Sequence, residues 1–184
     1  VRYRGALIEA RDHGALSPST TTARMRTVIR FYRYASGHNF ISRDAPKWQD
    51  KIVVLLQECA NSRDQVLLLL LAETGFRIGE LLGVRYATDI DYERHLLYVN
   101  FREDNENGAR AKNAEYRKAK ISDATFEILQ FYIEEYKDLI FQQEYLIINI
   151  SGDYAGKPMQ DSGVYALMER LQKKTGIKVT PHML

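Results

Sequence analysis

The residues of this 184-residue chain best suited to chemistry are Arg77 and Glu80, three positions apart just after a glycine. A helix is predicted over residues 63–74, ended by Gly75, and a second over 78–84, so Arg77 falls at a sharp junction near a helix N-terminus. Such an end favours anions, and a guanidinium is a planar fork suited to two phosphate oxygens. Glu80 shares a helical face with Arg77 and is placed to orient it. The pair indicates a phosphate-binding site or, on spacing alone, an ordinary surface ion pair.

A second basic feature lies in the N-terminal quarter of the chain. Residues 1–47 hold nine Lys or Arg against three Asp or Glu, a net charge of +6, whereas residues 48–184 hold seventeen against twenty-one, a net charge of −4. An amphipathic helix predicted in the first segment carries Arg26, Arg30 and Arg33 opposite its apolar side. This helix is expected either to face a nucleic-acid backbone or to be an ordinary solvated surface helix.

The elements that must position these residues are mostly helical. Two predicted strands flank a polar, Gly-containing turn and indicate an antiparallel hairpin. The fold class predicted is therefore mainly α with a small antiparallel β-sheet (α+β). The predicted elements are helices over 50–60, 63–74, 78–84 and 162–175, a helix that begins at 122–123, strands over 96–99 and 116–121, and a short apolar run of undetermined type over 145–150.

Composition excludes several classes of protein. With 45% hydrophobic and 27% charged residues, the chain resembles an average globular protein and not a disordered one. Its single cysteine, Cys59, excludes an internal disulfide and a Cys-based zinc cage. No apolar run approaches the ~20 residues that span a bilayer, and no secretory leader opens the chain, so a cytoplasmic location is expected. Because it begins at Val1 and stops at Leu184, we expect a piece of a longer protein.

Four short motifs follow one another along the chain. They are Thr74-Gly75-x-Arg77-x-x-Glu80-Leu81; Lys112 with Arg117 five residues later and then Ile121; Gly156-Lys157-Pro158-Met159; and Thr180-Pro181-His182-Met183-Leu184. In this order they resemble the tyrosine recombinases, the lambda-integrase-like site-specific recombinases of the phage integrase family. The four correspond to the first arginine box, the β-hairpin, the segment before the second box, and the opening of the His-x-Leu-Arg-His box. The resemblance covers residues 63–184, and motifs in register are far more specific than any one alone.

This resemblance implies a domain organisation and an activity. It implies that residues 1–42 are the C-terminal part of a helical core-binding domain and that residues 43–49 are a linker. Residues 50–184 would be a catalytic domain that is incomplete at its C-terminus. The activity implied is cleavage and rejoining of DNA strands through a 3′-phosphotyrosine, in a mobile element, a phage or a chromosome-maintenance system. Double-stranded DNA is the partner implied, with no metal or other cofactor. The full-length protein would be a homotetramer on paired sites, and this piece a monomer.

The resemblance also assigns roles at the site. Arg77 would be half of a two-arginine clamp on the phosphate, Lys112 would protonate the leaving 5′-oxygen, and His182 would assist by hydrogen bonding or proton transfer. Glu80 would support Arg77 without reacting. The second arginine and the nucleophilic tyrosine are expected beyond this chain, so the piece itself is expected to be inactive. Competing candidates for the role of Lys112 are Lys118 and Lys120.

Two other functions stay open at this point. One is a non-catalytic DNA-binding module on the same fold, and the other is a helical interaction domain without a nucleic-acid role. The last predicts no DNA binding, whereas a recombinase predicts DNA affinity that falls steeply with salt.

Overall fold

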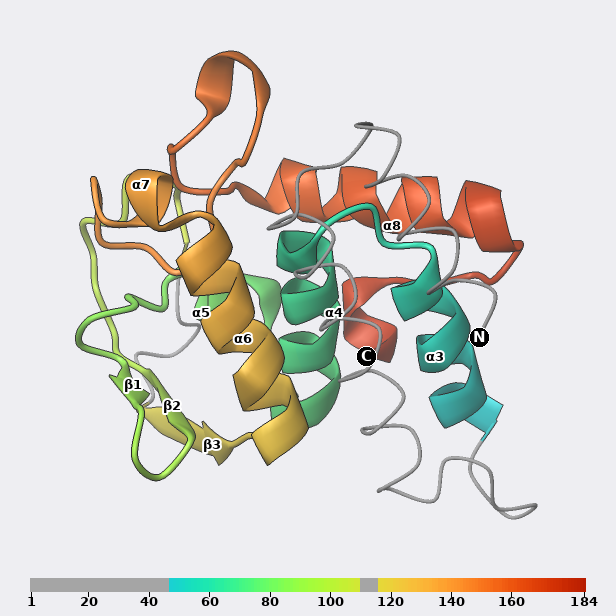
Figure 1. Ribbon diagram of the computed structural model, residues 1–184, viewed down its shortest axis with the longest axis horizontal. Coiled ribbons are helices and arrows are strands. Elements are labelled where there is room, and N and C mark those ends of the chain that lie inside the picture. Colours follow the sequence, from blue (N-terminus) through green and yellow to red (C-terminus); the bar gives the residue numbers. More distant parts are fainter. Residues whose placement is uncertain (1–46, 110–115) are drawn as a thin grey trace, which may run out of the picture. The chain divides into compact units, whose positions relative to one another are not determined.

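The structure, a computed structural model, describes residues 47–109 and 116–184 (Figure 1). The chain divides into two compact units, Val1–Pro46 and Lys47–Leu184, and all described residues belong to the second. The predicted N-terminal helix with Arg26, Arg30 and Arg33 lies outside the described residues, as does Lys112.

The described part is mainly helical with a three-stranded antiparallel sheet, which confirms the predicted fold class. None of its helices is both long and apolar enough to cross a bilayer. The helices are α3 (Lys47–Gln57), α4 (Ser62–Thr74), α5 (Ile78–Leu82), α6 (Asp123–Glu135), α7 (Lys137–Ile140) and α8 (Asp161–Thr175), with the 3-10 helices η2 (Gly152–Tyr154) and η3 (Pro181–Met183). The strands are β1 (Ile90–Asp91), β2 (Leu96–Val99) and β3 (Arg117–Lys120).

Helix α4 is the centre of the hydrophobic core. Val66 and the five leucines that follow it are each at most 1% exposed, as expected for a helix that is apolar on all sides. The side chain of Asn61 caps the helix by accepting a hydrogen bond from the Asp64 N–H at 2.9 Å. Figure 1 shows α4 between α6 and α3, both of which pack on it. The turn that follows α4 therefore begins from a rigid element.

The sheet has the order β1-β2-β3. The predicted hairpin is confirmed, with Tyr98 opposite Lys118 and Val99 opposite Arg117. Strand β1 was not predicted, because two residues carry too little of a period-2 pattern to be recognised. Along β3, Arg117 is half-buried whereas Lys118 and Lys120 are exposed, so the two lysines lie on the face opposite Arg117.

A buried carboxylate joins the start of α4 to α8. Asp64 is fully buried and accepts hydrogen bonds from Arg63 Nε at 2.7 Å and from Arg170 Nη2 at 2.6 Å. Arg63 also donates to the Ile148 carbonyl at 3.3 Å. A charge inside the core costs much free energy unless it is paired, so this cluster fixes α8 against the central helix.

Some predicted boundaries were wrong. Helix α3 begins at Lys47, inside the segment 43–49 predicted as a linker, and ends at Gln57 instead of residue 60. The run over 145–150 forms neither a helix nor a strand; its polar groups are satisfied partly through isolated bridges to Arg85 and to Pro158.

Candidate active site at the turn between α4 and α5

The turn after α4 is built by four consecutive residues. Gly75 has a φ of +60°, which glycine adopts without strain, and its N–H donates to the Leu71 carbonyl at 3.2 Å to end the helix. The Thr74 hydroxyl accepts a hydrogen bond from the Phe76 N–H at 3.1 Å, and the Phe76 ring is buried. Arg77 follows in an extended conformation and is the residue immediately before α5. The turn thus anchors both sides of Arg77 and leaves its side chain half-exposed.

Glu80 binds Arg77 at two points. Its Oε2 accepts a hydrogen bond from the Arg77 main-chain N–H at 2.8 Å, and its Oε1 accepts one from Arg77 Nη1 at 3.0 Å. The side chain of Glu80 is 1% exposed and that of Arg77 is 48% exposed. The carboxylate is therefore a buried support beneath a guanidinium that solvent can reach, and not part of a surface ion pair. Because α5 has only five residues, we attribute the positive charge here to the guanidinium groups and not to the helix end.

Arg117 is a second cation on the same carboxylate, which sequence reasoning missed. Its Nη1 donates to Glu80 Oε2 at 2.7 Å, and its guanidinium lies over the Phe76 ring with 5.4 Å between the guanidinium carbon and the ring centroid. In the sequence, Arg117 was recognised only as part of the hairpin motif and was given no role at the site. Two arginines on one buried glutamate leave a local net charge of +1 that faces solvent, which suits an anionic ligand.

Of the other residues assigned to the site, His182 lies within the described residues and Lys112 lies outside them. His182 is exposed in η3, where the Met183 N–H donates to the Thr180 carbonyl at 2.9 Å. Within the described residues, no hydrogen bond or ion pair joins His182 to Arg77 or Glu80. That Arg77, Lys112 and His182 act at one site stays a prediction.

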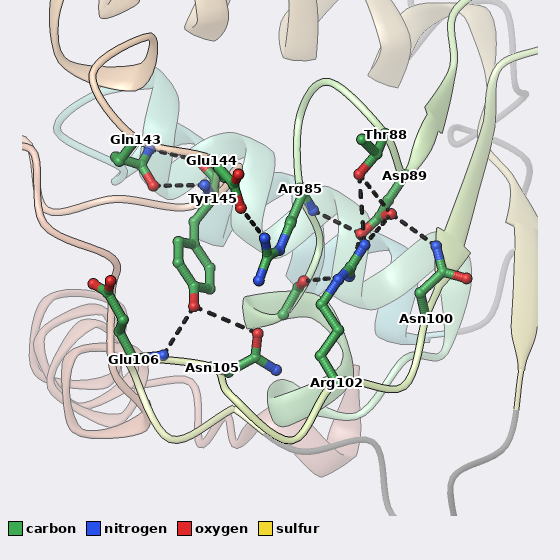
Figure 2. A network of polar contacts seen from close by, with 11 residues as sticks. Arg85, Thr88, Asp89, Asn100, Arg102, Asn105, Glu106, Gln143, Glu144 and Tyr145 are labelled. Carbon is green, nitrogen blue, oxygen red and sulfur yellow. Dashed lines mark hydrogen bonds and ion pairs between the residues drawn. The ribbon is translucent and has the colours of Figure 1, made fainter.

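A second polar network holds the loop that follows β2 (Figure 2). Arg102 donates to both oxygens of the buried Asp89 at 2.7 Å, and Asn100 donates to the same carboxylate at 2.7 Å. Burial raises the pKa of Asp89, but the hydrogen bonds from Arg102, the Arg85 main-chain N–H and Asn100 outweigh it, so that the pKa lies below its ordinary value. No sequence signal indicated this network, since Asn100 and Arg102 lie 11 and 13 residues from Asp89, a separation that follows no helix or strand period.

The same loop is fixed at two further points. The side chain of Asn107 donates to the carbonyls of Leu82 and Met159, each at 3.0 Å. The Tyr145 hydroxyl accepts a hydrogen bond from the Glu106 N–H at 2.9 Å, also drawn in Figure 2. The described part of the loop between β2 and β3 is therefore attached to α5, to Met159 two residues before α8, and to Tyr145.

A pocket in the described part of the chain lies away from this cluster. Its volume is about 660 Å³ and its walls include Asn107, Asn149, Lys157 and Ser162, near the start of α8. None of Arg77, Glu80 and His182 lines it. Within residues 47–109 and 116–184, no three His, Cys, Asp or Glu side chains gather closely enough to hold a metal ion. Among the described residues, the candidate site presents the half-exposed guanidinium groups of Arg77 and Arg117.

Comparison with known families defines the class of protein. Residues 48–184 match the phage integrase family, and the chain belongs to this family. The predicted membership is thereby confirmed.

The relatives carry more particular names. Over 131 residues the chain is 31% identical to transposase A from transposon Tn554 of Staphylococcus aureus, a match that covers 71% of this chain and 36% of the relative. Over 148 residues it is 30% identical to tyrosine recombinase XerA of Saccharolobus solfataricus, which covers 78% of this chain and 42% of the relative. The matches thus span well under half of each relative.

Solved structures show the same fold. XerA recombinase superposes with a TM-score of 0.56 at 19% identity, over 98% of this chain and 62% of that one. The Tn1549 transposon integrase, solved in complex with transposon right-end DNA, superposes with a TM-score of 0.53 at 18% identity, over 97% of this chain and 67% of that one.

Proposed function

We propose that this chain is part of a site-specific DNA recombinase or integrase of a mobile element, which cleaves and rejoins DNA through a 3′-phosphotyrosine. The observation that carries the proposal is the half-exposed guanidinium of Arg77 held by the buried carboxylate of Glu80. The names of the relatives, transposase A and XerA, and the DNA bound by the Tn1549 integrase support it.

The reaction is an exchange of phosphodiester bonds. A tyrosine oxygen attacks the phosphorus, the bond from phosphorus to the 5′-oxygen breaks, and the 5′-oxygen leaves with a proton. A 5′-hydroxyl of another strand then reverses the step and releases the tyrosine. In this proposal the tyrosine and the second arginine come from parts of the protein beyond Leu184, so the chain as given binds DNA and does not cleave it.

Arg77 has the chemistry that the transition state needs. Negative charge accumulates on the non-bridging oxygens during attack, and a fixed cation there lowers the barrier by roughly 3 kcal/mol. Glu80 prevents the guanidinium from rotating freely, so little reorganisation is needed at the moment of reaction. His182 is proposed to donate a hydrogen bond to the same phosphate.

The leaving oxygen needs a proton donor, and Lys112 is proposed for this role. An ammonium can be tuned to lose a proton, whereas a guanidinium stays charged. Lys118 and Lys120 are weaker candidates because they lie on the face of β3 opposite Arg117, whose side chain binds Glu80.

The proposed substrate is double-stranded DNA bound by four protomers on paired sites. The local net charge of +1 on Arg77, Arg117 and Glu80 suits a polyanion such as the DNA backbone. Arg26, Arg30 and Arg33 are proposed to contact the DNA backbone from the N-terminal unit.

The test uses the full-length protein encoded by the gene to which this chain belongs and duplex DNA from the ends of the element that carries the gene. We expect a covalent protein–DNA adduct on a denaturing gel, reduced about 100-fold or more by Arg77→Ala. Lys112→Ala should be rescued by a 5′-bridging phosphorothiolate, whose sulfur leaves without a proton. Salt-dependent DNA binding without any adduct would instead identify a non-catalytic DNA-binding module, and no DNA binding would identify an interaction domain.

A further inference from the structure

Arg117 binds the same buried carboxylate as Arg77. Its Nη1 donates to Glu80 Oε2 at 2.7 Å, the same oxygen that binds the Arg77 main-chain N–H at 2.8 Å. We infer that Arg117 is a positioning residue, which holds the carboxylate of Glu80 and thereby fixes the guanidinium of Arg77 for the phosphate. This inference rests on the proposed function and adds a residue to it.

The charges explain why a second arginine is needed. Glu80 is 1% exposed, and a buried carboxylate with only one cation would draw that cation tightly onto itself. Because Arg117 supplies a charged donor to Oε2, Arg77 engages only Oε1 with its side chain, through Nη1. Within the described residues, Nε and Nη2 of Arg77 have no protein acceptor, so they are available to phosphate oxygens.

The position of Arg117 is itself fixed by the turn. Its guanidinium lies over the Phe76 ring at 5.4 Å, and Nη2 approaches the Gly75 carbonyl at 3.5 Å, the long limit of a hydrogen bond. Gly75 and Phe76 directly precede Arg77. A lysine at 117 would keep one bond to Glu80 and lose the planar stacking and the second donor.

The experiment compares two DNA substrates in the full-length protein. One has an ordinary scissile phosphodiester, and the other has a methylphosphonate there, in which a methyl group replaces one non-bridging oxygen and removes its charge. Without that charge the transition state depends less on Arg77. We expect Arg117→Ala to slow cleavage of the phosphodiester about 10- to 100-fold, as typical for residues that orient a reactive group. The loss on the methylphosphonate should be several-fold smaller, as for Arg77→Ala.

Further variants separate positioning from other effects. The double variant Arg77→Ala/Arg117→Ala should cleave no more slowly than Arg77→Ala alone, because Arg117 acts through Arg77. Arg117→Lys should retain part of the activity. The matched control is Arg94→Ala, which removes an exposed arginine from the β1–β2 turn of the same sheet and should leave cleavage unchanged.

Several results would overturn the inference. Equal losses on the two substrates would mean a general folding defect, which thermal unfolding of Arg117→Ala and Arg117→Lys would also reveal. A double variant much slower than Arg77→Ala would mean that Arg117 contacts the phosphate itself. If Arg77→Ala does not cleave DNA while Arg117→Ala cleaves it normally, the role of Arg117 is wrong and the proposed function stands. If Arg77→Ala cleaves DNA normally, the proposed function itself is wrong.

Discussion

Glu80 fixes Arg77 through both its backbone and its side chain, with hydrogen bonds of 2.8 Å from the main-chain N–H and 3.0 Å from Nη1. The spacing of three residues allows this because Arg77 precedes the first residue of α5 and Glu80 lies in its first turn. A surface pair at this spacing would contribute little to stability. The burial of Glu80 makes the difference, since its charge has few partners other than these arginines.

Removing the charge of Glu80 is expected to destabilise the chain. Glu80→Gln should lower the free energy of unfolding by about 1–3 kcal/mol, less than for a fully buried pair because both arginines can regain water. Urea unfolding measures this. Glu134→Gln, at an exposed glutamate paired with Lys137, should change stability by at most about 0.5 kcal/mol. Equal effects of the two variants would contradict the buried role of Glu80.

The Asp89 network predicts a pH-dependent contribution to stability. The pKa of Asp89 is lower in the folded chain than its ordinary value, so its contribution is complete above the unfolded pKa of about 3.9 and is lost as the pH falls through the folded pKa. Asp89→Asn should therefore be less stable than the wild-type chain at pH 7, and the difference should shrink below pH 4. Urea midpoints at pH 7, 5 and 3.5 measure it. The control is Asp153→Asn, at an exposed position, which should show no such change with pH. If the stability difference between Asp89→Asn and the wild-type chain were the same at all three pH values, the ionised carboxylate of Asp89 would not be the source of the stabilisation.

Gly75 and Gly176 form a matched pair for separating strain from function. Each ends a helix with a positive φ, +60° and +71°, and a Cβ at either would meet no atom within 4 Å. Alanine at either position should therefore cost about 1–2 kcal/mol from backbone strain alone, measured by thermal unfolding. In the full-length protein only Gly75→Ala should slow DNA cleavage more than the stability loss explains, because Arg77 follows this turn. Equal cleavage by the two variants would refute that expectation.

Cys59 should be an unreactive thiol in the folded chain. Burial raises its pKa, and the nearby Asp64 carboxylate raises it further, so very little thiolate is present at pH 8. A chromogenic aromatic disulfide should react much more slowly with the folded chain than with the same chain in concentrated urea. Similar rates in the two conditions would mean that the segment after α3 opens readily.

The sequence predicted those elements and contacts whose residues lie close together along the chain. Helices α4 and α8 were predicted from local segments that end at Gly75 and Gly176, and the β2–β3 hairpin from two strand segments that flank a polar turn. The partnership of Arg77 with Glu80 followed from a spacing of three residues.

Long-range relationships gave no such signal. Arg117 is 37 residues from Glu80, and Arg170 is 106 residues from Asp64, so no periodicity connects them. The start of α3 was also misplaced, since a proline just before it was interpreted as part of a longer linker and not as a residue preceding a helix.

The ion pair between Asp64 and Arg170 has a mechanical consequence. Helix α4 is about 20 Å long. The ion pair lies at its first turn, and Arg77 lies three residues past its end. Rotation of α8 about its own axis would break the Arg170 hydrogen bond and leave the buried carboxylate of Asp64 with one charged partner fewer, so the pair opposes such a rotation. Helix α4 therefore connects the Asp64–Arg170 pair at its start to the turn that holds Arg77 after its end.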